Sequence, residues 1–206
     1  EKEHKKETVK IHKFIKSDAK QFLNKCNALS YSAPMDWANQ CYKWKNNWDN
    51  IPEGAEDDSD GISMYYFMDH LSKNNKQNSV VVSDAGSAYY VTSQSLKIKG
   101  EQRYVTSGAQ ADMGFTIPAC IGAANASKCN LDIVGITGDG SFQTNLQELQ
   151  TIKHHNYPIK IFVLNNKGYL SIRTTQRKFF NDRFVGTDNA SGISFPDTRD
   201  IAKAYG

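Results

Sequence analysis

The sequence of 206 residues lacks the features of a membrane protein, of a zinc site and of a nucleic-acid-binding surface. It has no apolar run of the about 20 residues that a bilayer-spanning helix needs, so we expect no membrane association. Its four cysteines form no Cys-x-x-Cys pair and have no histidine at metal-ligand spacing, which excludes a zinc ribbon or finger. A formal net charge of +3 with dispersed lysines gives no basic stripe, so nucleic acid is not an expected partner.

The first residues also lack an initiator methionine and an apolar signal segment. They form an alternating run of lysines and glutamates, which is typical of a solvated surface and not of a phosphate-binding arm. This opening and the scattered cysteines predict a cytoplasmic protein, and the missing methionine predicts a piece of a longer chain. The sequence also lacks internal repeats and low-complexity tracts.

The first part of the chain, residues 1–60, predicts one short strand and two helices. Alternating apolar residues place the strand at residues 9–15, and a cap at Asp18 begins a helix over residues 19–26. The second helix begins at Met35 and carries tryptophans at helical spacing. We interpret this tryptophan stripe as a surface that packs onto a neighbouring domain, since packing is the commoner reason for such a stripe.

Residues 51–61 are acidic and punctuated by Pro and Gly, which indicates a linker that ends the appendage at residue 60. The second domain, residues 61–206, opens with a helix at residues 64–71 and contains three runs rich in β-branched residues. Runs without polar alternation are typical of parallel strands buried on both faces. We therefore predict an α/β fold, a wound parallel sheet flanked by helices, with a helical N-terminal appendage. The strands are expected at residues 80–82, 133–136 and 159–164, and the crossover helices at residues 113–126 and 145–155.

Polar turns follow the three predicted strands, at the edge where open α/β sheets bind ligands. They are Ser83–Ser87, Gly138–Ser141 and Asn165–Gly168. The glycines of the second turn let backbone N–H groups approach an anion at the start of a helix. Asp139 would repel a bare phosphate, so this turn predicts a divalent cation between the carboxylate and phosphate oxygens.

Magnesium takes about six oxygen ligands and seldom receives all of them from protein. The Asp139 carboxylate, the Asn166 amide oxygen and the Gly168 main-chain carbonyl would supply three, provided that the two strand ends are neighbours. Asp139 and Asn166 are separated by one loop, one helix and one return strand, as neighbouring parallel strands require. The sequence therefore predicts a Mg²⁺ site made by these three residues.

Gly138–Ser141 followed by Leu164-Asn165-Asn166 resembles the thiamine-diphosphate motif, and the chain is similar throughout to the acetolactate synthase large subunit family. Ser83–Gly86 resembles the diphosphate-binding turn of that family, and residues 106–123 resemble the next block. The resemblance implies the end of a middle domain followed by most of a C-terminal diphosphate- and Mg-binding domain. It implies thiamine diphosphate and Mg²⁺ as cofactors, with FAD as a further candidate in the full-length parent.

The same resemblance implies roles for individual residues. Gly86, Ser87 and Ser141 would contact the diphosphate through backbone N–H and hydroxyl groups. Met113, whose thioether is apolar and polarizable, would wedge under the cofactor and hold its two rings in a bent shape, with an ordinary core residue as the alternative. The Ala111 carbonyl would accept a hydrogen bond from the pyrimidine amino group. The whole expected cofactor-binding set is Gly86, Ser87, Ala111, Met113, Gly138, Asp139, Gly140, Ser141, Asn166, Gly168, Tyr169 and Leu170.

The activity that the resemblance implies is decarboxylation of a 2-oxo acid such as pyruvate and transfer of the two-carbon unit to an acceptor, as in branched-chain amino acid biosynthesis. In that family the glutamate that activates the pyrimidine lies in an upstream domain, normally of a partner subunit. We therefore expect no catalytic residue in this chain, no turnover by the chain alone, and a parent protein that forms a homodimer or homotetramer.

Four positions depart from the family, which has glutamine, histidine and tryptophan where Ser87, Ala88 and Thr175 stand. The fourth is Asp112, where the family usually has a small residue, and the sequence assigns it no role. The acceptor is therefore open, and a 2-oxo-acid decarboxylase or carbon–carbon lyase of the same superfamily is an alternative. A non-catalytic cofactor-binding or assembly module is another. Arg173 matches the family, with a surface ion pair as the competing interpretation. His154 and His155 end a predicted helix, where positive charge is favourable, and are expected to be structural.

Overall fold

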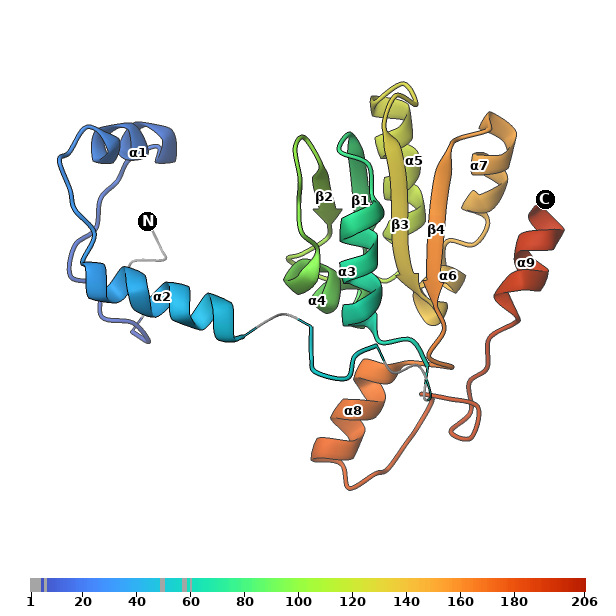
Figure 1. Cartoon of the computed structure of the whole chain (residues 1–206). Coiled ribbons are helices and arrows are strands. Elements are labelled where there is room, and N and C mark those ends of the chain that lie inside the picture. The colour runs from blue at the N-terminus through green and yellow to red at the C-terminus, as the bar shows by residue number, and fades with distance from the viewer. Residues whose placement is uncertain (1–4, 6, 49–50, 57–58, 60) are drawn as a thin grey trace. The chain divides into compact units, whose positions relative to one another are not determined.

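The computed structural model describes residues 5, 7–48, 51–56, 59 and 61–206 (Figure 1). The start of the charged N-terminal run, residues 1–4 and 6, and the middle of the predicted linker, residues 57–58 and 60, lie outside the described residues. The chain divides into two compact units, Glu1–Asp49 and Asn50–Gly206. Among the described residues, no helix combines the length and the apolar character that crossing a membrane requires.

The first unit contains the two expected helices, α1 (Ala19–Asn27) and α2 (Met35–Asn47). The Asp18 carboxylate caps α1 by accepting a hydrogen bond from the Gln21 N–H at 3.2 Å. The strand expected at residues 9–15 is wrong, because the described part of this unit offers no second strand for it to pair with.

The tryptophans of α2 lie on the surface of the first unit. The rings of Trp37 and Trp44 meet edge to face at 5.6 Å, and Trp48 stacks on Trp44 at 6.3 Å. Trp37 and Trp48 are 59% and 71% exposed, and neither helix buries a residue. The neighbouring domain that we expect to cover this stripe stays a prediction, as does the boundary at residue 60.

The second unit contains the predicted parallel sheet, with its strands in the order β2-β1-β3-β4. β1 pairs with β2 and β3, and β3 pairs with β4, so that Gly138 lies opposite Leu164. The strands are β1 (Ser79–Ser83), β2 (Arg103–Thr106), β3 (Asp132–Gly138) and β4 (Ile159–Leu164). β2 was not predicted, because its four residues include a charge and form no long apolar run.

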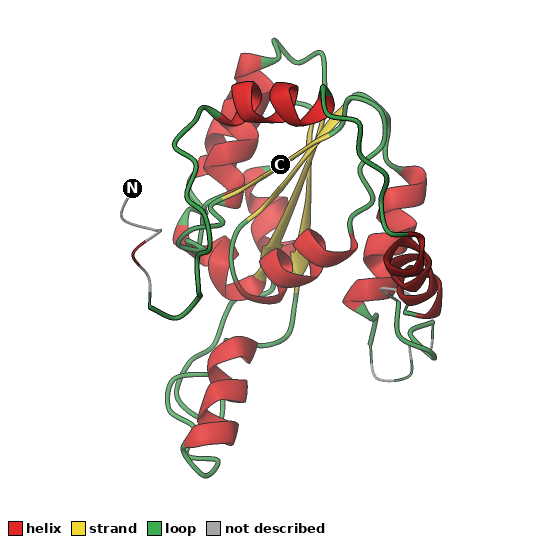
Figure 2. Cartoon of the chain, turned by 90° about the vertical axis from the view of Figure 1, so that its left-hand side faces the viewer, coloured by secondary structure: helices red, strands yellow, loops and turns green. Residues whose placement is uncertain are grey.

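Helices cover both faces of the sheet (Figure 2), which confirms the α/β fold. Val81 and Ile136 lie in the core beneath α3 (Met64–Asn74) and α4 (Gly86–Ser95), while Val82 and Ile133 lie beneath α5 (Thr116–Ala126). This alternation along each strand gives each face its own core. The other helices are α6 (Asp139–Thr144), α7 (Glu148–His155), α8 (Leu170–Phe179) and α9 (Thr198–Tyr205).

Several expected boundaries differ in the structure. β4 is not buried on both faces, because it lies at the edge of the described sheet and leaves Lys160 and Phe162 exposed. The helix expected at residues 113–126 begins only at Thr116, which leaves Met113 in the preceding loop. Helices α4, α8 and α9 were not predicted from the sequence.

Candidate functional site

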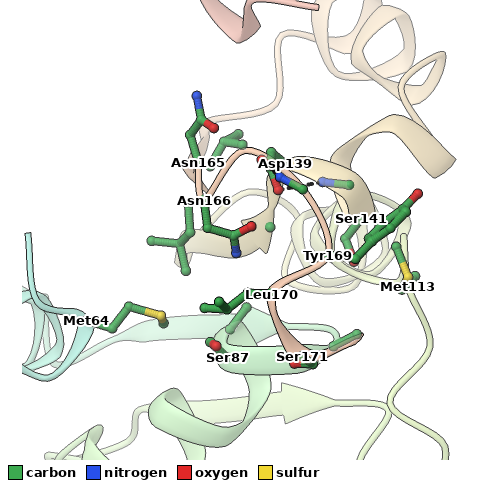
Figure 3. Close-up of a pocket in the computed structure, with 18 of the residues that line it drawn as sticks. Met64, Ser87, Met113, Asp139, Ser141, Asn165, Asn166, Tyr169, Leu170 and Ser171 are labelled. Carbon is green, nitrogen blue, oxygen red and sulfur yellow. Dashed lines mark hydrogen bonds between the residues drawn. The ribbon is translucent and has the colours of Figure 1, made fainter. Parts of the chain in front are cut away.

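A cavity of about 640 Å³ lies at the carboxyl ends of β1, β3 and β4 (Figure 3). All of the expected cofactor-binding residues except Ala111 line it. Ala111 lies in the loop before α5 and adopts a left-handed backbone conformation with φ +55°. The strand topology thus collects one group of residues from turns far apart in the sequence, as expected for an open α/β sheet.

Asp139, the first residue after β3, joins the loops that follow β3 and β4. Its side chain is buried, and its Oδ1 accepts a hydrogen bond from the Gly140 N–H at 2.9 Å. Its Oδ2 accepts one from the Gly168 N–H at 3.0 Å. The two strand ends are therefore neighbours, which is the condition that the predicted magnesium site required.

Two glycines allow this close approach. Gly168 has φ +141°, and a Cβ there would overlap the main-chain carbonyl oxygen of Thr187, which also accepts a hydrogen bond from the Tyr169 N–H at 2.8 Å. A Cβ on Gly140 would overlap the Tyr169 ring. A side chain therefore has no room at Gly168, in the loop of residues 165–168 (called the β4 loop below), or at Gly140, in the turn after β3.

The Asn166 side chain carries an oxygen with no hydrogen-bond partner. Its Oδ1 is buried and unpaired among the described residues, whereas the Asn165 Oδ1 accepts a hydrogen bond from the Lys167 N–H at 3.0 Å. In Figure 3 the Asn166 amide extends into the space between Asp139 and Leu170, and Asn165 points the other way. Buried acceptors without partners are costly and rare, so the site fits a cation that would use this oxygen.

The donor set at this position is mixed. Among the described residues, no group of three or more His, Cys, Asp and Glu side chains could hold a metal ion. The expected ligands are instead one carboxylate, one amide oxygen and one main-chain carbonyl. Hard oxygen donors of this kind suit Mg²⁺ and not a thiophilic metal.

The β1 side of the cavity offers backbone N–H groups. Gly86 begins α4 with φ +58°, and its N-cap residue, Ala85, makes no side-chain capping bond. Since the first N–H groups of a helix have no partner within it, the turn formed by Gly86, Ser87 and Ala88 suits an anion. Ser141, which is buried on α6, faces the same cavity from the β3 side.

Asp84 follows β1 but does not line the cavity. It is fully buried, and its carboxylate accepts hydrogen bonds from Thr137 Oγ1 and from the Ala85 N–H, both at 2.7 Å. Burial raises the pKa of Asp84 above its ordinary value of 3.8, and these two hydrogen bonds act in the opposite direction. Asp84 therefore joins the ends of β1 and β3 beneath the site.

Met113 is 40% exposed and lines the cavity from the loop before α5, so the core alternative for this residue is wrong. Cys120 is buried, and burial, with the nearby Asp84 charge, raises the pKa of its thiol to about 12. Such a thiol is a packing group and not a nucleophile. His154 and His155 lie in the last turn of α7, at the helix end where the sequence places them, and their structural role stays a prediction.

Sequence reasoning missed part of the cavity wall. Ile62, Met64 and Ile172 line it, although Met64 had been expected only as the start of a helix. Their apolar character gave no functional signal. Thr175 does not line the cavity, and its hydroxyl donates to the Ser171 carbonyl on its own helix at 3.1 Å. Ala88 does line it.

Arg173 lies outside the cavity lining, one turn into α8. Its side chain is only 18% exposed, and Nη2 donates to the Asn166 main-chain carbonyl at 3.0 Å. It also lies 3.6 Å from the Asp188 carboxylate, whose pKa is lowered mainly by the Ser191 hydroxyl. Arg173 therefore forms an ion pair, as the competing interpretation expected, but the pair is partly buried and the same side chain also binds the backbone after β4.

A family model described as "Thiamine pyrophosphate enzyme, C-terminal TPP binding domain" matches residues 84–206. The acetolactate synthase large subunit of Cyanidium caldarium is 32% identical over 87% of this chain and 29% of its own length. The acetolactate synthase isozyme 2 large subunit of Escherichia coli (strain K12) is 30% identical over 83% of this chain and 30% of its own length. Acetolactate synthase 1, chloroplastic, of Oryza sativa subsp. japonica is 27% identical over 94% of this chain and 31% of its own length. The chain therefore spans about 30% of the length of these relatives.

Proposed function

The chain belongs to the thiamine pyrophosphate enzymes, through their C-terminal TPP-binding domain, and from this premise we propose that it holds the Mg²⁺ and diphosphate of an acetolactate-synthase-like carboligase. Thiamine pyrophosphate is the same compound as thiamine diphosphate. The observation that carries the proposal is the buried, unpaired Oδ1 of Asn166 in the cavity that Asp139 lines. The similarity to acetolactate synthases supports the reaction class.

In this proposal the residues after β3 and β4 bind the cation, and those at the start of α4 bind the anion. Asp139, Asn166 and the Gly168 carbonyl hold Mg²⁺, while Gly86, Ser87 and Ser141 orient the diphosphate. Met113 would support the cofactor from the loop before α5, and the apolar wall that includes Leu170 would exclude water. When bound, thiamine diphosphate supplies the electron sink that decarboxylation of a 2-oxo acid needs.

The proposal assigns binding and orientation to this chain and assigns proton transfer to a segment outside it. No catalytic side chain is proposed among residues 1–206. The chain alone is expected to show no turnover and weak cofactor affinity, and the complete protein is expected to act as a cytoplasmic homo-oligomer.

The binding part is tested by calorimetric titration of the chain with thiamine diphosphate, with and without Mg²⁺. We expect heat of binding only when both are present, because without the cation the Asp139 carboxylate would repel the diphosphate. Equal binding in the presence of EDTA would contradict the magnesium site.

The reaction is tested by product analysis of the full-length protein with pyruvate, thiamine diphosphate and Mg²⁺. Acetolactate is expected from a carboligase. Acetaldehyde would favour the decarboxylase alternative. That alternative stays open because Ala88 and Thr175 depart from the acetolactate synthase pattern. Cofactor binding without any product would favour a non-catalytic module.

A further inference from the structure

The β4 loop is held from outside the cavity by the side chain of Arg173. Its guanidinium group donates from Nη2 to the Asn166 carbonyl at 3.0 Å and from Nη1 to the Lys167 carbonyl at 3.4 Å. Because the guanidinium is planar and presents its donors as a fixed fork, it can fix the directions of two successive carbonyl groups.

Each of these carbonyls belongs to a peptide plane that is also held at its other end. The Lys167 carbonyl shares a plane with the Gly168 N–H, which donates to Asp139 at 3.0 Å. The Asn166 carbonyl shares a plane with the Lys167 N–H, which donates to the Asn165 side chain at 3.0 Å. Two consecutive peptide planes are therefore clamped on both edges.

This clamp holds a backbone conformation that is unfavourable by itself. Lys167, between the two planes, has φ +57°, in the left-handed region that residues with a side chain seldom adopt. Such conformations cost on the order of 1–3 kcal/mol and persist when surrounding contacts over-determine them. The hydrogen bonds from Arg173 are part of those contacts.

Arg173 is itself anchored by the turn at residues 187–191. The Asp188 carboxylate, 3.6 Å from Arg173 Nη1, accepts hydrogen bonds from the Ser191 N–H at 2.9 Å and from the Ser191 hydroxyl at 2.7 Å. The neighbouring Thr187 is fully buried, and its carbonyl accepts the Tyr169 N–H at 2.8 Å. This turn supports the loop and its arginine together.

We propose that Arg173 is a positioning residue, which sets the Asn166 amide and the Gly168 carbonyl in the orientation that binds the cation. The inference rests on the proposed function, since it concerns the same site. Arg173 does not line the cavity, so its effect on the cation passes through the β4 loop. Loss of an outer hydrogen-bonding partner of this kind typically weakens metal affinity about 10–100-fold.

The test is a Mn²⁺ titration of the full chain in the presence of thiamine diphosphate, followed by electron paramagnetic resonance. Arg173→Gln is expected to weaken Mn²⁺ binding by about 10–100-fold. Arg173→Lys keeps the positive charge but loses the forked pair of N–H donors, so its affinity for Mn²⁺ should lie between those of the wild type and Arg173→Gln. Arg177→Gln is the matched control. Arg177 lies one turn further along α8 and forms an ion pair with Asp182 in which both side chains are exposed. The Arg177→Gln variant should bind Mn²⁺ as the wild type does.

The outcomes separate the inference from the proposed function. Absence of Mn²⁺ binding by the wild type would overturn both. Wild-type binding together with equal binding by Arg173→Gln would overturn the inference alone. If circular dichroism finds Arg173→Gln unfolded, Arg173→Lys and Asp188→Asn decide: weaker binding by these folded variants supports the inference, and wild-type affinity in both overturns it.

Discussion

Two strand ends of the same sheet carry an aspartate in the same position. Asp84 follows β1 and Asp139 follows β3, and both side chains are buried. Each accepts a hydrogen bond from the N–H of the residue that follows it and a second one from a residue far away in the sequence. In sequence and in burial the two turns are alike, so neither criterion distinguishes a ligand from a structural residue.

The partners of the two carboxylates make the difference. Asp84 is hydrogen-bonded to the Thr137 hydroxyl of the neighbouring strand and does not line the cavity. Asp139 is hydrogen-bonded to the backbone of the β4 loop and lines the cavity with Asn166, whose Oδ1 has no partner. The Asp84 carboxylate is therefore satisfied by the protein alone, whereas the ends of β3 and β4 leave one side-chain oxygen, the Asn166 Oδ1, for a ligand.

Replacing Asp139 should have the largest effect. Asp139→Ala removes a proposed metal ligand and the acceptor that holds the Gly168 N–H, so Mg²⁺-dependent thiamine diphosphate binding should fall by more than about 100-fold. Isothermal titration calorimetry measures this loss. Asp182→Ala, which removes an exposed carboxylate, is the control and should leave binding unchanged. If Asp139→Ala kept the wild-type affinity for thiamine diphosphate, Asp139 would be no more a metal ligand than Asp84.

Asn166→Ala should separate binding from stability. Mg²⁺ affinity is expected to fall by about 10–100-fold. The free energy of unfolding without ligand should scarcely decrease, because the Asn166 Oδ1 makes no hydrogen bond among the described residues. Urea unfolding and calorimetry on the same sample check both parts. A large loss of stability in the ligand-free variant would mean that Asn166 is structural.

Gly168→Ala and Gly86→Ala compare the packing of the two ends. Both glycines have positive φ, so both variants carry the backbone strain of roughly 1–3 kcal/mol. Only at Gly168 would the Cβ also overlap a backbone atom, the Thr187 oxygen, whereas at Gly86 it would meet the movable Ser171 hydroxyl at 3.2 Å. Urea unfolding should therefore give a larger loss for Gly168→Ala. Equal losses would contradict the close approach at the β4 loop.

The smallest effect is expected at Asp84 and depends on pH. Burial raises the folded-state pKa of Asp84 above 3.8, so its stabilising contribution is full below that pH and is lost as pH rises through the raised pKa. Asp84→Asn should remove this loss, so its stability relative to the wild type should increase as pH rises above 3.8. Thr137→Val, which deletes a hydrogen bond that lowers the pKa of Asp84, should extend the loss to higher pH. Parallel stability curves for wild type and Asp84→Asn would contradict the assignment.

The sequence was sufficient to predict the parallel sheet and most of the cavity wall. Runs of β-branched residues predict buried strands. The turns after β1, β3 and β4 contain the glycines and polar residues that a phosphate and a cation require. It was insufficient for β2, whose four residues form a strand because β1 offers an edge. The predicted strand at residues 9–15 failed for the opposite reason, because nothing described in its unit pairs with it.

The roles of Asp84 and Arg173 also lay beyond sequence patterns. Asp84 stands in a glycine-containing turn like Asp139, and only the Thr137 hydroxyl that meets it from the neighbouring strand identifies it as structural. Arg173 contacts the β4 loop through backbone carbonyls, which every residue has, so no residue type marks the contact. Both assignments depend on long-range packing that local periodicity does not contain.

The most direct measurement is the position of Mn²⁺ in crystals grown with thiamine diphosphate, located by anomalous scattering. We predict a single strong peak bounded by the Asp139 carboxylate, the Asn166 Oδ1 and the Gly168 carbonyl, with no peak beside Asp84. A Mn²⁺ ion bound elsewhere, or diphosphate density at the start of α4 without a metal between it and Asp139, would contradict the account.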